Sequence, residues 1–518
     1  MQFKVQEIVV DDMIKTDARN TLLTRLKEYE GDSFVYGAIS VEMLDSIIVN
    51  MKKGKAAGLD NLTIEHLQFA HPVVCCILSK LFNLMVMFNY VPIEFGKGVI
   101  IPIPKGEGKQ ACNKSDNYRG ITLSPVLSKV FENCLAAFLR KYLVSSERQL
   151  GFKKGVGCNN AIFSVRKVVD YFVSNNSTVN ICTVDLTKAF DRLSHDILFV
   201  KLMDRRVPRC ILETIKNWYD KMCCKVKWGN SLSAMFVIKA GVRQGGILSP
   251  SLFSIYVDDI LVKLEKSKMG CFIKNVCTNS YMYADDLLLL SISLKDMQSL
   301  VDLCESEFNK IGMAINNKKT SCLRIGKRHN VIVQPILVDG LVIPWKQELK
   351  YLGVTITSAR HFKTNNQAVK QKFFRAVNGI FGKIGLKSSA ELICSLISSH
   401  CIPILMYASE VLTWSLKDLR SMSFAYDQPF NKIFKSFDKK VIRSCQYYLH
   451  ILPFNRLLEL RRLNFLANEN NSVRFDKTDN MNTIRVLMKG YNITKDGTKQ
   501  FAWKNYVWLD FQAEIDSM

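Results

Sequence analysis

Three aspartates are the residues of this 518-residue chain best suited to chemistry. Asp285 and Asp286 are adjacent within Ser-Tyr-Met-Tyr-Ala-Asp-Asp-Leu-Leu-Leu-Leu (280–290), so strand-like apolar residues flank both acids, and Asp185 ends the β-branched run 180–184. Neighbouring carboxylates at the tip of an apolar hairpin repel each other and lose hydration, so they stay ionised together only beside a cation. We therefore predict a metal site formed by Asp185, Asp285 and Asp286.

Magnesium is the expected ion, because it prefers hard oxygen ligands and binds through a few carboxylates together with substrate phosphates. Two such ions about 3.5–4 Å apart stabilise the attacking and leaving oxygens in phosphoryl transfer. We expect two Mg²⁺ ions, for which Mn²⁺ can substitute, and no covalent nucleophile. A solvated acidic turn is the alternative for an isolated Tyr-Ala-Asp-Asp.

A second acidic pair, Asp258 and Asp259, lies in a different pattern. It follows Ser249 and Pro250, an expected N-cap and first helical residue, and apolar residues recur around it at helical spacing. We predict that these two acids lie on a helix and have a structural or surface role.

The expected elements around the aspartates come from periodicity and from turn residues. We predict a strand at 180–186, a hairpin carrying 285 and 286, and helices from Ser40 (N-cap), from about Ser194 and over 123–139. The apolar run 99–104 precedes a basic loop at 105–120. Residues 73–93 read as a buried helix and not as a membrane span, since Lys80 and Pro92 interrupt them.

The composition favours a polyanionic partner. Lysine and arginine outnumber the acidic residues 71 to 47, and the formal net charge is +24. This surplus points to nucleic acid first and to an anionic membrane surface second. Residues 361–450 are helical in pattern, with 13 basic and 5 acidic residues and many aromatic ones. Sixteen cysteines without regular spacing, and no secretory signal, predict reduced thiols in an intracellular protein, without a zinc site.

A series of motifs resembles the reverse transcriptases of LINE-type (non-LTR) retrotransposons. They are, in chain order, 54–60 (Gly-Lys-Ala-Ala-Gly-Leu-Asp), 118–121 (Tyr-Arg-Gly-Ile), 185–191 (Asp-Leu-Thr-Lys-Ala-Phe-Asp), 241–250 (Gly-Val-Arg-Gln-Gly-Gly-Ile-Leu-Ser-Pro), 283–286 (Tyr-Ala-Asp-Asp), 316–320 (Asn-Asn-Lys-Lys-Thr) and 349–353 (Leu-Lys-Tyr-Leu-Gly). The resemblance covers roughly residues 40–360, and seven motifs in order are far more specific than any one alone.

The resemblance implies an α+β right-hand polymerase fold, with α/β fingers, an antiparallel palm with helices on one face, and a helical thumb. The expected division is a 1–39 N-terminal extension, 40–179 fingers with part of the palm, 180–360 palm, 361–452 helical thumb and a 453–518 C-terminal extension. The implied reaction is RNA-directed DNA synthesis, in which a primer 3′-hydroxyl attacks the α-phosphate of a dNTP. The implied partners are an RNA template, a DNA primer and dNTPs, without a membrane.

The resemblance also assigns roles to single residues. Phe190 corresponds to the steric gate below the nucleotide sugar, and a core phenylalanine is its alternative. Arg119 and Lys105 would contact the triphosphate, Gln244 would line the template and nucleotide side, and Lys319 would neutralise or protonate pyrophosphate. The implied primer grip is Leu349, Tyr351, Leu352 and Gly353, for which a plain edge strand is the alternative.

Two other functions compete with an active polymerase. One is a catalytically lapsed or domesticated RNA-binding relative, which would be expected to lose carboxylates, whereas this chain keeps all three. The other is an inactive or truncated element copy. We expect no endonuclease in this chain, because only about 40–50 residues precede the finger motifs. The expected location is the nucleus, the cytoplasm or both.

Overall fold

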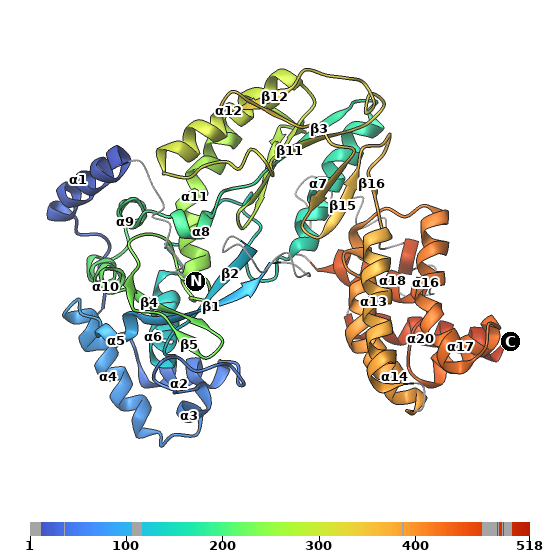
Figure 1. Cartoon of the computed structure of the whole chain (residues 1–518), viewed down its shortest axis with the longest axis horizontal. Coiled ribbons are helices and arrows are strands. Elements are labelled where there is room, and N and C mark those ends of the chain that lie inside the picture. The colour runs from blue at the N-terminus through green and yellow to red at the C-terminus, as the bar shows by residue number, and fades with distance from the viewer. Residues whose placement is uncertain are drawn as a thin grey trace.

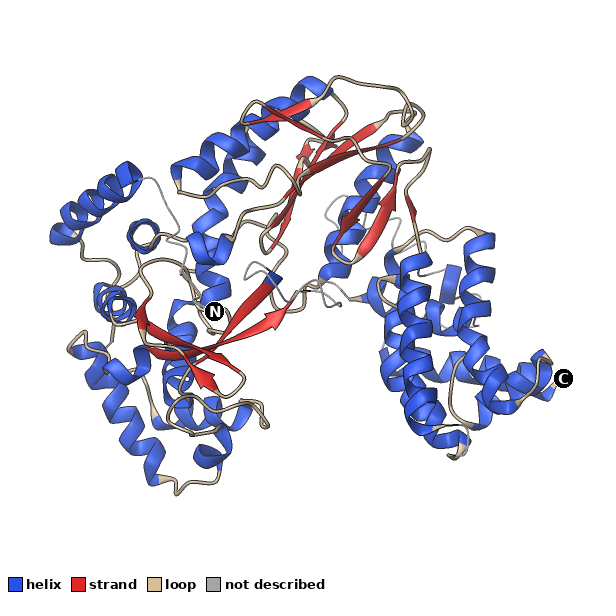
Figure 2. Ribbon diagram, viewed as in Figure 1, coloured by secondary structure: helices blue, strands red, loops and turns tan. Residues whose placement is uncertain are grey.

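The computed structural model describes residues 12–35, 37–105, 117–385, 388–468, 484, 486–488, 491 and 500–517. The structure has a helix-rich part with a small twisted sheet, a second sheet flanked by helices, and a helical bundle. The chain alternates between the first two parts before it enters the bundle, as the colour gradient in Figure 1 shows. Figure 2 shows the strands confined to the first two parts, with the third made of helices. This division matches the α+β right-hand polymerase fold expected from the sequence.

The second sheet carries the aspartates. Its four antiparallel strands are ordered β11 (Ser321–Ile325), β3 (Val179–Val184), β10 (Asp286–Ser291) and β9 (Ser280–Tyr283). The predicted strand and the predicted hairpin are both confirmed, as β3 and as the β9–β10 pair. Leu287 pairs with Val184, so the register brings the end of β3 beside the start of β10.

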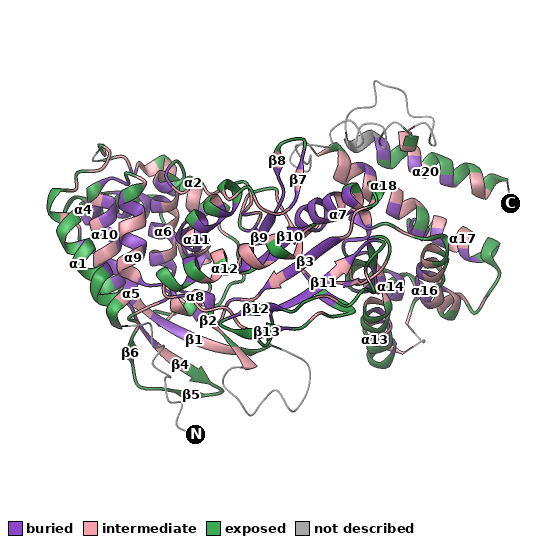
Figure 3. Ribbon diagram, turned by 90° about the horizontal axis from the view of Figure 1, so that it is seen from above, coloured by how far each residue is buried: buried purple, intermediate pink, exposed green. Residues whose placement is uncertain are grey.

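Helices cover this sheet on both faces. Cys182, Val184, Leu287 and Leu289 share one core with α11 (Ser249–Lys266) and α12 (Leu294–Lys310). The alternate residues of the same strands face a second core, which includes α7 (Cys158–Ser174). The expectation of helices on one face is therefore wrong, and two covered faces explain why the run 287–290 is uninterruptedly apolar. Figure 3 shows these strands buried between the helices.

The first sheet is ordered β2 (Tyr118–Leu123), β1 (Lys97–Pro104), β4 (Cys223–Trp228) and β5 (Ser231–Leu232), and β6 (Phe236–Val237) pairs with β4. The predicted apolar run 99–104 lies in β1, which is antiparallel to β2 and parallel to β4. Residues 106–116 of the expected basic loop lie outside the described residues.

Nine helices of the described chain surround this sheet or link it to the second one. They are α1 (Asp12–Glu28), α2 (Val41–Asn50), α3 (Ile64–Gln68), α4 (Val73–Met87), α5 (Ile93–Gly96), α6 (Val126–Leu139), α8 (Ala189–Arg192), α9 (His195–Asp204) and α10 (Arg209–Asp220). The Ser40 hydroxyl accepts a hydrogen bond from the Met43 amide, which confirms Ser40 as the N-cap of α2.

Helix α4 is buried on one face only, whereas the sequence predicted a buried helix. Phe82 and Met85 lie in the core, whereas Ile77, Leu81 and Leu84 are exposed on the opposite face. The prediction of a buried helix is therefore correct for one face and wrong for the other. In the part of the chain that the structure describes, no helix has both the length and the apolarity that a membrane crossing requires.

Small strand pairs accompany the second sheet. β7 (Phe272–Ile273) pairs with β8 (Val276–Cys277) before β9, and β12 (Ile336–Val338) pairs with β13 (Leu341–Ile343) after β11. β14 (Glu348–Tyr351), β15 (Val354–Thr357) and β16 (Lys363–Thr364) form a small sheet that precedes the helical bundle. The bundle contains α13 (Gln367–Ile384), α14 (Ala390–Leu396), a π-helical turn (Ile397–Cys401), α15 (Ile402–Leu405), a 3₁₀ turn (Ser409–Val411), α16 (Leu416–Phe434), α17 (Lys439–Tyr448), α18 (Phe454–Ala467) and α20 (Gln500–Asp516). Its apolar core runs from Phe373 to Leu458 and so crosses the expected thumb boundary at 452.

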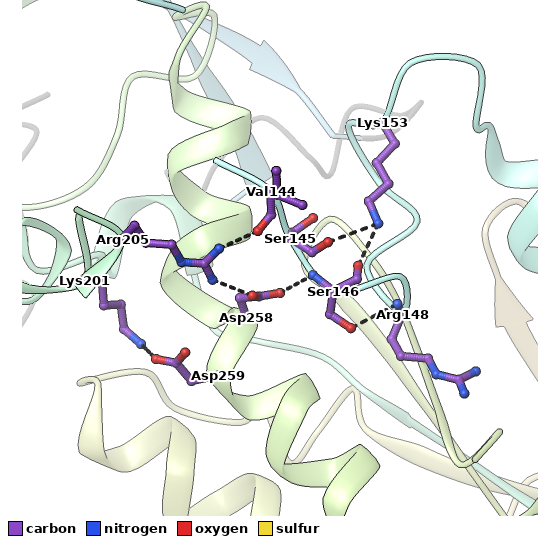
Figure 4. Close-up of polar contacts among 9 residues, drawn as sticks. All are labelled: Val144, Ser145, Ser146, Arg148, Lys153, Lys201, Arg205, Asp258 and Asp259. Atoms are coloured by element: carbon purple, nitrogen blue, oxygen red, sulfur yellow. Dashed lines mark hydrogen bonds and ion pairs between the residues drawn. The ribbon is translucent and has the colours of Figure 1, made fainter. Parts of the chain in front are cut away.

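The acidic pair at 258 and 259 lies on α11, as predicted. Asp258 is buried, accepts a hydrogen bond from the Ser146 amide (2.6 Å) and forms an ion pair with Arg205 (2.6 Å). Asp259 points away from this network and pairs with Lys201 near the surface, as Figure 4 shows. The two neighbours therefore differ in burial, although both are aspartates on the same helix.

Replacement of Asp258 by alanine should leave Arg205 without its buried partner. Loss of one member of a buried pair costs about 3 kcal/mol, whereas Asp259→Ala removes an exposed pair and costs about 0–1 kcal/mol. Thermal unfolding should therefore give a lower melting temperature for Asp258→Ala, by roughly 6 °C or more, and a nearly unchanged one for Asp259→Ala. Equal losses for the two variants would contradict the structural role of Asp258.

Candidate active site

Asp185, Asp285 and Asp286 lie at one end of the second sheet. Asp185 follows the last residue of β3, Asp286 begins β10, and Asp285 lies in the two-residue turn between β9 and β10. Leu287 of β10 pairs with Val184 of β3, so the same register, continued by one residue, places Asp286 opposite Asp185. Ala284, the first turn residue, has φ +57°, a left-handed conformation that is unusual for alanine.

The site concentrates negative charge in a poorly hydrated place. Burial, together with the charges of Asp285 and Asp185, raises the pKa of Asp286 to about 6, although one side of this residue is open to solvent. Burial is also the main cause that raises the pKa of Asp285, and Asp185 adds to it. The charges of Arg119 and Lys319 lower both pKa values. These two cations therefore lie within electrostatic reach of the aspartates.

The segment at 314–320 lies against Asp185. The Asn316 amide donates to the Asp185 carbonyl (2.7 Å), and the Asp185 amide donates to the Thr320 hydroxyl (3.3 Å). These bonds bring Lys319 close, and its ammonium nitrogen lies 3.4 Å from Asp185 Oδ2. The structure thus joins two motifs that are more than 100 residues apart in the sequence.

The carboxylate oxygens suit a hard cation. Asp185 Oδ2 is buried and has no hydrogen-bond partner among the described residues, so only the Lys319 charge compensates it. Among those same residues, no three His, Cys, Asp or Glu side chains converge enough to hold a metal ion by themselves. Magnesium commonly binds through one or two carboxylates and completes its shell with substrate phosphates and water. Asp185, Asp285 and Asp286 are the residues that would hold it here.

Phe190 follows Asp185 by five residues, on the short helix α8, and is partly buried between two other aromatic rings. Its ring stacks on Phe253 at 4.5 Å between centroids and 17° between planes, and Phe152 meets it edge-on at 6.2 Å. This packing holds the Phe190 ring in one orientation while part of it stays accessible. Such a fixed ring can act as a steric barrier, and it also contributes to the core, so both readings of Phe190 from the sequence have support.

Gln244 and the strand β2 form the opposite side of the site. The Gln244 carbonyl accepts a hydrogen bond from the Thr122 amide (2.8 Å), and its side-chain amide lies 3.4 Å from Asp191 Oδ1. Gly245 has φ +114°, and a Cβ there would lie 3.0 Å from the Thr122 carbonyl oxygen. Only glycine suits this close approach, which holds the half-buried Gln244 next to β2.

The cations expected to contact a triphosphate come from the β1–β2 hairpin. Arg119 is on β2, opposite Ile103 of β1, and is exposed. The Lys105 amide donates to the Asn117 carbonyl (2.8 Å) where the two strands end. Burial raises the pKa of Asp191, and the charge of Lys105 partly offsets this rise. Arg119 therefore reaches the aspartates from the first sheet, whereas Lys105 lies within electrostatic reach of Asp191.

The hairpin expected to grip a primer has a mixed character. Leu349 and Tyr351 of β14 are buried in the second core, where burial, with a contribution from Asp286, raises the pKa of the Tyr351 hydroxyl far above its usual value. Leu352 and Gly353 form the turn with φ +43° and +85°, and the Leu352 carbonyl accepts a hydrogen bond from Tyr407 (2.8 Å). Only the turn is available for contact, so the two β14 side chains fit the alternative of a structural strand.

One residue of the site was not predicted. Gln149 is fully buried, and its side chain is hydrogen-bonded to the backbone of Ala284, directly before the aspartates. The sequence around Gln149 has neither helical nor strand periodicity, so it gave little indication that this residue belongs to the site. Glutamine is also rarely fully buried, so its burial was not expected.

The clustering of carboxylates makes a prediction about stability. Without a divalent metal, Asp285→Asn should raise the melting temperature at pH 7.5 by about 1–3 °C, because it removes repulsion among neighbouring, partly desolvated charges. Added Mg²⁺ or Mn²⁺ should then stabilise the wild-type chain more than the variant. Differential scanning fluorimetry with EDTA and with each metal measures both effects. A variant that melts below the wild-type chain in EDTA and gains as much from the metals would contradict the cluster.

Comparison with known proteins finds a matching family model and several similar proteins. Residues 103–356 match the family model for reverse transcriptase (RNA-dependent DNA polymerase). The chain is 23% identical over 449 residues to a probable RNA-directed DNA polymerase from transposon BS of Drosophila melanogaster, covering 82% of this chain and 46% of that protein. It is 24% identical over 389 residues to the RNA-directed DNA polymerase from mobile element jockey of Drosophila funebris, covering 72% and 41%.

Two further similarities complete the comparison. A Pol polyprotein from the type-2 retrotransposable element R2DM of Drosophila melanogaster is 26% identical over 341 residues, covering 64% of this chain and 31% of that protein. Among solved structures, apo telomerase from Candida tropicalis aligns with a TM-score of 0.41 and 15% identity, covering 84% of this chain and 74% of that one. The chain spans less than half the length of these curated relatives. Together with the seven motifs, the matched region and these relatives support a reverse transcriptase of the LINE type.

Proposed function

We propose that this chain is an RNA-directed DNA polymerase that extends a DNA primer on an RNA template. The observation that carries the proposal is the group of three carboxylates at the end of the second sheet, which Arg119 and Lys319 approach from two different parts of the chain. An acidic metal site between cations is what nucleotidyl transfer needs, because a nucleotide brings both a metal and a highly charged triphosphate.

In this proposal the aspartates hold two Mg²⁺ ions, which supply positive charge where negative charge develops during phosphoryl transfer. Arg119 binds phosphate oxygens through its planar fork, and Lys105 adds a point charge nearby. Lys319, which lies beside Asp185, neutralises or protonates the leaving pyrophosphate. The primer 3′-hydroxyl attacks the α-phosphate, and the new phosphodiester bond forms as pyrophosphate leaves.

The remaining residues select and align the substrates. The fixed Phe190 ring would meet a 2′-hydroxyl and so favour deoxynucleotides, and Gln244 lines the template and nucleotide side. The Leu352–Gly353 turn would contact the primer terminus. The basic helical bundle would follow the phosphates of the template and primer. We also propose that the chain acts in the nucleus, the cytoplasm or both.

Primer extension tests the proposed activity. The full chain should extend an oligo(dT) primer on poly(rA) with Mg²⁺, and Asp285→Asn should reduce the rate by about 10³-fold or more while primer–template binding persists. Asp259→Asn is the matched control, since it changes one acid of the surface pair on α11 and should extend at the wild-type rate. The proposal fails if Asp285→Asn extends as fast as the wild-type chain, and an RNA-binding role without catalysis replaces it if the wild-type chain binds but does not extend.

Sugar selection gives an independent prediction. Phe190→Val should raise the ratio of ribonucleotide to deoxynucleotide incorporation by about 10–100-fold, because the smaller side chain leaves room for a 2′-hydroxyl. Single-nucleotide incorporation assays with dTTP and UTP measure this ratio. Phe253→Leu, below the stacked ring, should have a smaller effect in the same direction because Phe190 loses its support. An unchanged ratio in Phe190→Val would assign Phe190 to packing alone.

A further inference from the structure

A buried glutamine holds the turn that carries the aspartates. The Gln149 side-chain oxygen accepts hydrogen bonds from the Gly151 amide (3.0 Å) and from the Ala284 amide (3.1 Å). Its side-chain nitrogen donates to the Ala284 carbonyl (3.2 Å). Both polar backbone groups of Ala284 are therefore bound by one fully buried side chain. Ala284 is the residue directly before Asp285.

Ala284 needs such support because of its backbone conformation. Its φ of +57° is unfavourable for a residue with a Cβ, which crowds the following carbonyl oxygen. A turn of this kind usually has glycine in that position. The two hydrogen bonds from Gln149 to Ala284 stabilise the left-handed conformation, and with it the direction in which Asp285 and Asp286 leave the turn.

The backbone around Gln149 is attached to the same hairpin. The Leu150 amide donates to the Met282 carbonyl (2.8 Å), and the Met282 amide donates to the Arg148 carbonyl (2.9 Å). A Cβ on Gly151 would lie 2.4 Å from the Ala284 nitrogen, so only glycine fits against the turn. The Arg148 guanidinium lies over the Tyr281 ring of β9 at 5.5 Å. Residues 148–151 thus follow the β9 edge up to the turn.

The other end of this segment is held by the core. Asp258 binds the Ser146 amide, Arg205 binds the Val144 carbonyl, and the Lys153 ammonium donates to the Ser146 carbonyl (2.7 Å), as Figure 4 shows. Phe152, next to Gly151, meets the Phe190 ring. A single segment, anchored on α11, therefore contacts both the aspartate turn and the expected sugar barrier.

We propose that Gln149 is a positioning residue of the active site, which fixes Ala284 so that Asp285 and Asp286 present their carboxylates to the metal. The importance of Gln149 for catalysis rests on the proposed function. The hydrogen bonding of the turn and the metal affinity of the site can both be measured without catalysis. Gln149 does not itself reach the substrate. If Gln149 were only structural, its replacement would lower the stability of the chain without a specific effect on the turn or on the metal site.

Hydrogen exchange on the wild-type full chain is the first test. The Ala284 amide should exchange at least tenfold more slowly than expected for an exposed turn, because it is bonded to a buried oxygen. In Gln149→Leu the peptide around 281–287 should exchange at least tenfold faster than in the wild-type chain. An Ala284 amide that exchanges as a free turn amide in the wild-type chain overturns the proposal, even if the variant does not fold.

Metal affinity is the second test, and Gln446→Leu is the matched control. Gln446 is also a fully buried glutamine, but it lies on α17 and bonds Asp427 and Arg443. Mn²⁺ titration followed by electron paramagnetic resonance should give an affinity at least fivefold weaker in Gln149→Leu, and an unchanged one in Gln446→Leu. Equal Mn²⁺ affinities in all three chains would overturn the positioning role.

Primer extension completes the design. In Gln149→Leu the Mg²⁺ concentration for half-maximal rate should rise at least fivefold, whereas Gln446→Leu should change only the fraction of active chain. A variant that loses stability and keeps the wild-type Mg²⁺ dependence assigns Gln149 to the core and overturns the proposal. If the wild-type chain does not extend primers but exchange and Mn²⁺ binding change as expected, Gln149 still positions a metal site, and the proposed polymerase function is what fails.

Discussion

Electrostatic repulsion among Asp185, Asp285 and Asp286 is the constraint on which the rest of the structure depends. Charges that lose hydration disfavour one another, and the raised pKa of Asp286 reflects this. A fold can keep such a group only if the backbone that carries it is firmly held. Here the β3–β10 register, the Asn316 and Thr320 bonds to Asp185, and the contacts of Gln149 with Ala284 supply that support.

The compensation for this charge comes from elements that are distant in the sequence. Lys319 approaches from the segment before β11, and Arg119 from the hairpin of the other sheet. Neither one neutralises the group completely, and Asp185 Oδ2 keeps no hydrogen bond within the described residues. The remaining negative charge can bind a divalent cation that also coordinates phosphate oxygens. The chain as a whole, with its net charge of +24, is suited to a polyanion around this acidic centre.

Much of this arrangement was predictable, because it is local. The β-branched run before Asp185 and the short apolar runs on both sides of the acidic turn are typical of strands, and they are strands. Asp258 and Asp259 have helical neighbours, and they lie on α11. The same reasoning could not tell which of these two acids is buried, since that depends on Arg205 and Ser146, which are remote in sequence.

What sequence reasoning missed depends on tertiary contacts. Three features follow from how elements pack, and no single segment encodes them. They are the covering of the second sheet on both faces, the exposed apolar side of α4, and the burial of Leu349 and Tyr351. Gln149 is the clearest case. It lies outside any helix or strand, and its importance comes only from a hydrogen-bond partner 135 residues away.

A structure of the full chain with an RNA–DNA primer–template, an unreactive dNTP analogue and Mn²⁺ tests the central claim most directly, because manganese is located by its anomalous scattering. The account predicts manganese bound by carboxylate oxygens of Asp185 and Asp285, with the analogue's phosphates beside Arg119 and its sugar against Phe190. Manganese or nucleotide bound elsewhere, with the three aspartates facing solvent alone, would contradict it.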